Sequence, residues 1–152
     1  MIMKLATALS ERSDIQNKIS EISVRLNNNA KVQDGDTPAE NPIKLMEELD
    51  ILLIRLEDLM AKINLTNSKT IYDGKTITEL LAHRDCLKKK IEVMRNFLNN
   101  ASNRVNRVTR TEIKIISTVP VDEIQETLDC LSKELRQTDE KIQELNWITE
   151  LI

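Results

Sequence analysis

The chain has 152 residues, 40% hydrophobic and 31% charged, which is typical of one globular domain rather than a disordered segment. Only 2% of the residues are aromatic, with two glycines and three prolines, which argues against a sheet-rich fold. The net charge of −3 excludes a whole-molecule attraction to nucleic acid, and no apolar run is long enough for a membrane span or a signal peptide. We therefore expect a cytoplasmic, mainly α protein with a single helical-bundle domain over residues 1–152.

The first expected helix carries a heptad seam. Its apolar positions step by three and four from Leu5 to Leu26, and Arg12 is the single exception. Residues 30–40 follow with an Asp-Gly-Asp sequence and Pro38, which is typical of a surface loop.

The second expected helix has a standard start, with Asn41 as the N-cap and Pro42 at the first helical position. Its seam runs at heptad spacing through residues 45–63. Met46, Leu53 and Met60 widen this seam beyond what a two-stranded coiled coil requires. We expect this helix to be central and to contact several neighbours.

A β-hairpin is expected next, because Asp73-Gly74 lies between two short β-favouring pairs. Thr76 and Glu79 then match a capping box for a third helix, whose heptad seam over residues 80–101 contains Arg84. Residues 111–119 are rich in β-branched side chains and end before a proline, so we predict a short strand that can pair with the hairpin.

The fourth expected helix is capped by Asp122 with Gln125, and its seam reaches Ile152. At about 23 to 30 residues each, the four helices are roughly 35 to 45 Å long. The pattern predicts an antiparallel bundle of four long amphipathic helices with a small β-hairpin and strand element at one end.

The charges cluster along the chain. Residues 84–114 contain nine Lys or Arg and three acidic residues. Arg104, Arg107 and Arg110 are three apart and Lys114 follows, which makes them candidates for binding an anion or a partner. Since no aromatic side chains are interleaved among these four residues for stacking, we favour pairing with acidic helices of this subunit or a second one.

Two seam arginines, Arg12 and Arg84, occupy positions where the period demands apolar residues. A buried arginine requires a charged partner, and the candidates are Asp14, Asp85 and Asp139. We favour a role in fixing helix register or oligomeric state, and the alternative is a polar pocket.

Catalytic motifs are weak. The single histidine, His83, has no glutamate three residues before it, as a di-metal bundle requires. Cys86 and Cys130 are expected to be reduced thiols that pack between helices. With two glycines in all, there is no Gly-rich phosphate loop. We expect no catalytic residues, metal or cofactor, and an enzyme of an unrecognised kind is an alternative.

Several strings resemble those of the septicolysin-like family of small bacterial proteins. They include Glu40-Asn41-Pro42 and Asp73-Gly74-Lys75, within a set at residues 5–12, 29–33, 40–42, 63–67, 73–79, 84–85, 107–114 and 139–147. The resemblance covers nearly the whole chain and implies a helical protein of unknown molecular function. The family label implies a pore-forming haemolysin, which is the second functional reading.

The ends of the apolar pattern predict assembly. Met46, Leu53 and Met60 exceed what one core face needs, and the terminal residues Trp147, Ile148, Leu151 and Ile152 need a covering surface. We therefore expect a non-catalytic homo-oligomeric interaction or structural protein, a dimer or higher, in contact through these residues. Its expected partner is itself. We expect no nucleic acid, and no membrane unless the haemolysin reading is right, and the sequence identifies no small-molecule substrate.

Overall fold

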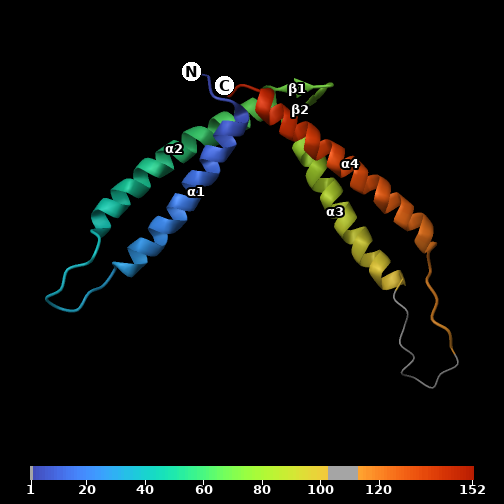
Figure 1. Cartoon of the computed structure of the whole chain (residues 1–152), viewed down its shortest axis with the longest axis horizontal. Helices are drawn as coiled ribbons and strands as arrows, with labels where there is room; N and C mark the ends of the chain where they lie inside the picture. The colour runs from blue at the N-terminus through green and yellow to red at the C-terminus, as the bar shows by residue number, and fades with distance from the viewer. Residues whose placement is uncertain (1, 103–112) are drawn as a thin grey trace. The chain divides into compact units, whose positions relative to one another are not determined.

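The structure, a computed structural model, describes residues 2–102 and 113–152. Within these residues it contains four helices and one two-stranded sheet (Figure 1). In chain order the elements are α1 (Leu5–Asn28), α2 (Pro42–Lys69), β1 (Ile71–Tyr72), β2 (Lys75–Thr76), α3 (Ile77–Ser102) and α4 (Val121–Ile148). The predicted mainly α fold, with four long helices and a small β-hairpin, is confirmed.

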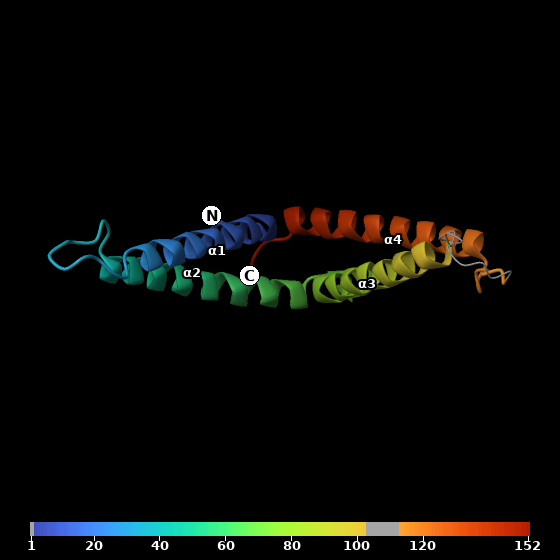
Figure 2. The same ribbon diagram turned by 90° about the horizontal axis from the view of Figure 1, so that it is seen from below.

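The chain divides into two compact units, which are described separately. The first unit is Met1–Ile77 together with Gln143–Ile152, and the second is Thr78–Ile142. In the first unit α1 packs along α2, and in the second α3 packs along α4, as the paired ribbons of Figure 2 show. The last turn of α4 belongs to the first unit. The single domain over residues 1–152 stays a prediction.

The core of the first unit lies on the heptad seams of its two helices. From α1 it takes Leu5, Ala8, Ile15 and Ile22, and from α2 it takes Leu45, Leu59 and Ile63. The start of α2 is fixed as expected, because the Asn41 side chain accepts a hydrogen bond of 2.9 Å from the amide of Ile43. Burying these aliphatic side chains supplies most of the free energy that pairs the helices.

The second unit has its own core between α3 and α4. Ile91, Leu98 and Leu128 are buried there. Five partly buried side chains pack around them: Met94, Val121, Ile124, Leu131 and Leu135. Both seams were expected from the spacing of apolar residues.

The hairpin forms where the Asp-Gly pair predicts it. Ile71 lies opposite Thr76 and Tyr72 opposite Lys75 in an antiparallel register. Asp73 and Gly74 have φ angles of 49° and 76°, and two consecutive positive φ angles are the requirement of the tight hairpin turn.

The strand predicted over residues 111–119 is wrong for its described part, residues 113–119, while residues 111–112 lie outside the described residues. Residues 113–116 adopt no regular structure, and Ile113, Ile115 and Ile116 are 72 to 81% exposed. Strand propensity reflects packing against a neighbouring strand, and the two hairpin strands are only two residues long. Without a partner edge, the β-branched side chains do not suffice.

The turn conformation generates a first prediction. A Cβ at Gly74 meets no atom within 4 Å, so Gly74→Ala introduces backbone strain without a steric clash. Because alanine disfavours a positive φ, we expect the free energy of unfolding to fall by about 1 kcal/mol. Urea denaturation measures the change, with Lys75→Ala in the adjacent strand as a control expected to stay near wild type. Equal stabilities for the two variants would show that the turn does not restrain the fold.

Candidate functional site

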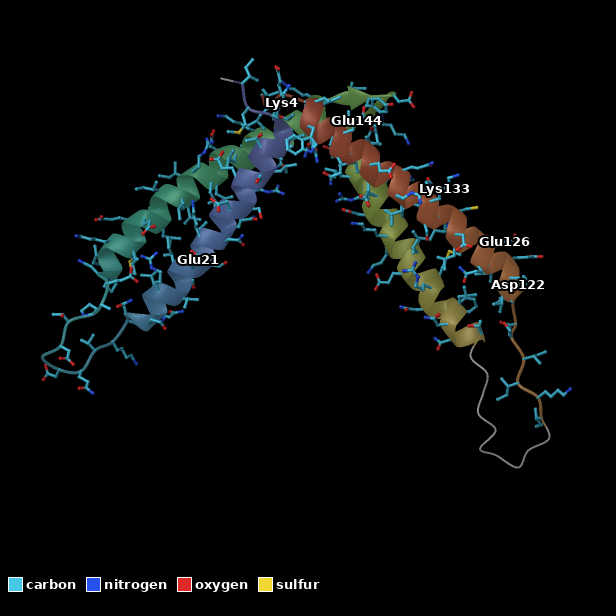
Figure 3. All side chains as sticks on the ribbon, viewed as in Figure 1. Lys4, Glu21, Asp122, Glu126, Lys133 and Glu144 are labelled. Atoms are coloured by element: carbon cyan, nitrogen blue, oxygen red, sulfur yellow. The ribbon has the colours of Figure 1, made fainter. Side chains whose placement is uncertain are left out.

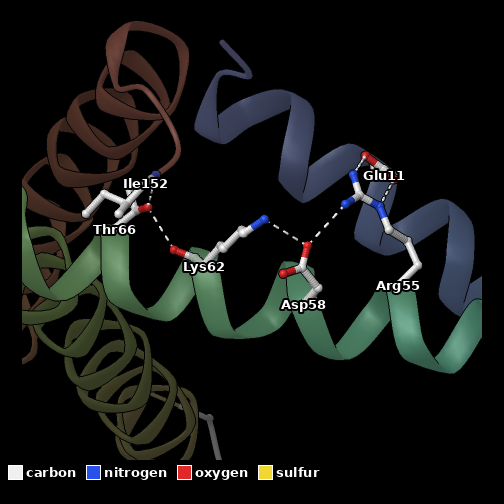
Figure 4. A network of polar contacts seen from close by, with 6 residues as sticks. All are labelled: Glu11, Arg55, Asp58, Lys62, Thr66 and Ile152. Atoms are coloured by element: carbon white, nitrogen blue, oxygen red, sulfur yellow. Dashed lines mark hydrogen bonds and ion pairs between the residues drawn. The ribbon is translucent and has the colours of Figure 1, made fainter. Parts of the chain in front are cut away.

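A network of charged side chains joins α1 to α2 in the first unit (Figure 4). The guanidinium of Arg55 donates through Nε to Oε1 of Glu11 at 2.6 Å and through Nη2 to Oε2 at 3.0 Å. Its Nη1 donates to Oδ2 of Asp58 at 3.2 Å, and Lys62 Nζ donates to the same oxygen at 3.0 Å. This two-bond fork fixes the relative position of the two helices more strictly than apolar packing can.

The fork also changes the ionisation of its members. The hydrogen bond from Arg55 lowers the pKa of Glu11, and the hydrogen bond to Glu11 raises the pKa of Arg55. Both groups are therefore held in their charged forms. The sequence pattern did not identify this pair, because Glu11 and Arg55 lie beside the seams and are 44 residues apart in the chain.

The network continues to the C-terminal segment through Thr66, a fully buried polar residue. The Thr66 hydroxyl donates to the carbonyl of Lys62 at 2.7 Å and accepts from the amide of Ile152 at 3.1 Å. The amide of Leu151 donates to the carbonyl of Met3 at 2.8 Å. The end of the chain is thus held by α2 and by the residues before α1.

The start of α1 adds two contacts to this anchor. The amide of Leu5 donates to the carbonyl of Thr149 at 2.9 Å. Lys4 and Glu150 face each other across an isolated antiparallel bridge, with Lys4 Nζ 3.5 Å from Glu150 Oε1. The C-terminal backbone is therefore ordered within the chain itself, although we had expected it to need another surface.

A second ion pair closes the loop between α1 and α2. Arg25 Nε donates to both carboxylate oxygens of Glu40 at 3.1 and 3.0 Å, and this hydrogen bonding lowers the pKa of Glu40. The Asn29 side chain accepts from the amide of Glu40 at 3.0 Å and donates to the carbonyl of Arg25 at 2.8 Å. These contacts join the last turn of α1 to the residue before the cap of α2.

The seam arginines differ in their surroundings. Arg84 is partly buried, with 24% of its side chain exposed. Its Nη2 lies 3.2 Å from Oδ1 of Asp85, and its Nε lies 3.9 Å from Oδ1 of Asp139 on α4.

Arg12 is half-buried, and within residues 2–102 and 113–152 it makes no ion pair. Asp14 pairs instead with Lys18 at 2.8 Å. The role of these arginines in register stays a prediction.

Most of the basic candidates cannot be placed, because they fall between the two described ranges. Arg104, Arg107 and Arg110 lie outside the described residues, and Lys114 is exposed in the irregular segment after them. Their binding of an anion or a partner stays a prediction.

The groups with catalytic potential are dispersed. His83 Nε2 lies 3.0 Å from Oε1 of Glu134, an exposed pair between α3 and α4. Cys86 and Cys130 are free and exposed, so our expectation that they pack between helices is wrong. Both face away from the seam, where the spacing places larger aliphatic residues. Among the described residues, no group of three or more His, Cys, Asp or Glu side chains could hold a metal ion.

Apolar side chains remain exposed on the first unit. On α2 they include Met46, Leu53, Ile54 and Met60, and Ile54 is 70% exposed. The term α2 outer face is used below for the stripe on α2 formed by Met46, Asp50, Leu53, Ile54, Glu57 and Met60. At the C-terminus Trp147 is 66% and Ile148 60% exposed, Ile152 is exposed, and Leu151 is half-buried. These two groups form the candidate interaction surface.

Across residues 2–102 and 113–152, the structure contains no helix with an apolar stretch long enough to span a bilayer.

The Glu11–Arg55 fork generates a second prediction, in which Glu11→Gln lowers the free energy of unfolding at pH 7 by up to about 1 kcal/mol. The folded pKa of Glu11 lies below its ordinary value of 4.5, so its contribution is present above that value and lost as the pH falls through the folded pKa. Urea denaturation between pH 7 and pH 3 should show a smaller acid-induced loss for the variant. The control is Glu21→Gln, on the same helix (Figure 3), whose stability should depend on pH as that of the wild type does. If the pH profile of Glu11→Gln matched that of Glu21→Gln, the prediction would be contradicted.

The Thr66 anchor generates a third prediction. Thr66→Val preserves volume but leaves the Ile152 amide without its acceptor, which should cost about 1 to 3 kcal/mol. Thr127→Val is the matched control, since the Thr127 hydroxyl bonds only within its own helix, at 3.1 Å to the carbonyl of Glu123. Urea denaturation measures stability, and hydrogen exchange of the Ile152 amide should accelerate only in the first variant. Unchanged exchange there would show that Thr66 does not anchor the terminus.

Comparison with known proteins places the chain in a family. A family model described as a family of unknown function, DUF6847, matches residues 12–151. A solved structure, described as a functionally unknown conserved protein from Corynebacterium diphtheriae, is 42% identical, covers 100% of both chains and has a TM-score of 0.92. The comparison with curated proteins gives no match.

These matches overturn the resemblance to the septicolysin-like family, because neither the family model nor the solved structure has a link to septicolysin. The short strings that suggested it consist largely of helix caps, turns and seam residues, which report local structure rather than descent. The haemolysin reading that depended on that label is withdrawn with it. The chain belongs to the DUF6847 family, a family of unknown function.

Proposed function

We propose that this protein is a non-catalytic, homo-oligomeric helical interaction protein that assembles through the α2 outer face and its C-terminal residues. The observation that carries the proposal is the amount of apolar surface left uncovered. Among the described residues, twenty large hydrophobic side chains are exposed, whereas fourteen hydrophobic residues are buried. Scattered exposed side chains are normal, but apolar side chains aligned along one flank of a helix mark an interaction surface.

The stripe on α2 supports this proposal because it is separate from the seam. Leu45, Leu59 and Ile63 are buried against α1. Met46, Leu53 and Met60 recur every seven residues on the flank of that seam and are all exposed. A helix with one partner buries one stripe, so a second apolar stripe implies a second partner.

The C-terminal residues support the proposal through their ordered backbone. Thr149, Leu151 and Ile152 are hydrogen-bonded within the first unit, so the chain beside Trp147 and Ile148 is already fixed before any partner binds. A tryptophan presented from a fixed backbone loses little conformational entropy on association, and tryptophan is among the side chains that dominate interface energies. Leu151, the other predicted contact in this segment, is half-buried.

The non-catalytic part of the proposal rests on the arrangement of reactive groups. His83 pairs with Glu134 at the surface, and the two cysteines lie on different helices with exposed side chains. In the part of the chain that the structure describes, no cluster of metal-ligating side chains supports a hydrolytic or redox centre. A catalytic role would need a convergence of groups that these residues do not supply.

Multi-angle light scattering tests the proposal. At micromolar concentration we expect a mass of at least twice the 17.5 kDa of one chain. Trp147→Ala should raise the dissociation constant about tenfold or more, as at other buried interface tryptophans. The matched control is Ile116→Ala, an exposed hydrophobic residue outside the proposed surface, which should leave the mass unchanged.

Two outcomes contradict the proposal. A wild-type mass of 17.5 kDa throughout the micromolar range would remove the homo-oligomer. An unchanged dissociation constant for Trp147→Ala, with wild-type circular dichroism, would show that the C-terminal residues are not part of the interface. Shortening the chain by residues 147–152 is a less specific experiment, because it also removes the hydrogen bond between Ile152 and Thr66.

A further inference from the structure

The α2 outer face carries negative charge without compensation. Asp50 and Glu57 are separated by seven residues and lie on the stripe with Leu53 and Ile54 between them. All of these residues are exposed, and the structure gives neither carboxylate an ion pair among the residues it describes. The stripe therefore alternates apolar and acidic positions along the helix.

Two of the four cations of α2 are engaged elsewhere. Arg55 is held by Glu11 and Asp58, and Lys62 is held by Asp58. Lys44 and Lys69 lie six and twelve residues from the nearer of the two carboxylates, outside the three- or four-residue spacing of ion pairs on a helix. The two carboxylates are therefore available to a cation from a second molecule.

The outer face of α3 has the opposite charge. Leu87, Ile91 and Leu98 are buried on its inner side. Steps of three and four residues then place another stripe on the far side, all of it exposed: Ala82, Cys86, Lys89, Lys90, Val93 and Phe97. We call this set the α3 outer face.

Lys90 is the central charge of the α3 outer face. Lys89 lies 3.6 Å from Glu92, but within the described ranges Lys90 makes no ion pair. Val93 and Phe97 provide apolar surface on one side of Lys90, and the small residues Cys86 and Ala82 follow on the other. The stripe thus has one unpaired cation with packing surface around it.

The two stripes are complementary in order as well as in charge. Asp50 and Glu57 are about 10.5 Å apart along the helix axis, at 1.5 Å per residue. A lysine ammonium placed over Leu53 and Ile54 reaches either carboxylate, since its four-carbon stem is flexible. Phe97, seven residues after Lys90, then lies over Met60 if the two helices run parallel and over Met46 if they run antiparallel.

We propose that the α2 outer face of one copy packs against the α3 outer face of a second copy, with Lys90 between Asp50 and Glu57. The inference rests on the proposed function and specifies its contact. Like faces do not fit as well: two α2 outer faces would bring carboxylates together, and two α3 outer faces would bring lysines together, which opposes association. The crossed pair is the complementary arrangement of these two stripes.

Charge reversal tests the contact. Glu57→Lys and Lys90→Glu should each raise the dissociation constant about tenfold or more, because each places like charges across the interface. The double variant should return towards the wild-type value. An equimolar mixture of the two single variants should also assemble, since each supplies the charge that the other lacks. Sedimentation velocity measures all four samples, and circular dichroism verifies that each is folded.

The controls are the same charge changes on α4, Glu126→Lys and Lys133→Glu (Figure 3), for which we expect wild-type assembly. Tighter association of Glu57→Lys alone would indicate that α2 pairs with α2, and would overturn the inference. Failure of both the double variant and the mixture to recover, with the wild type still oligomeric, would overturn this contact and leave the proposed function standing. A monomeric wild type would contradict both this contact and the proposed function.

Discussion

A pair of helices can bury only one stripe of each member, and both units of this chain are built within that constraint. In the first unit α1 and α2 share one seam, and in the second α3 and α4 share another. Each core is therefore a line of aliphatic residues rather than a volume. Apolar side chains that do not lie on these lines, such as Leu53 and Val93, have no place in either core and remain at the surface.

Polar contacts supply the specificity that such a narrow core lacks. Aliphatic seams tolerate displacement along the helix axis, because one leucine replaces another after a heptad. A shift of one heptad would place Lys62 or Glu48 opposite Glu11, and neither side chain can form the two-bond fork that Arg55 makes. A role of Arg84 and Asp139 in fixing the register of the second unit stays a prediction. Surface ion pairs of this kind add little stability, but they distinguish one register from its neighbours.

The C-terminal segment shows how a sequence-distant contact completes a unit. Ile152 reaches the buried hydroxyl of Thr66, 86 residues away, and the backbone of Leu151 pairs with that of Met3. The Thr66 hydroxyl already donates to the carbonyl of Lys62, so this contact gives the amide of Ile152 an acceptor within the first unit. The same segment leaves the indole of Trp147 exposed beside a hydrogen-bonded backbone.

The sequence alone determined the elements whose causes are local. Heptad spacing predicted all four helices, Asn41-Pro42 predicted the start of α2, and Asp73-Gly74 predicted the hairpin, because each depends on residues within one or two turns. Tertiary structure decided what depends on distant partners. It left residues 113–119 without a strand, exposed Cys86 and Cys130, joined Glu11 to Arg55, and anchored Ile152 on Thr66. Periodicity reports which face of a helix is apolar, but not which other segment covers that face.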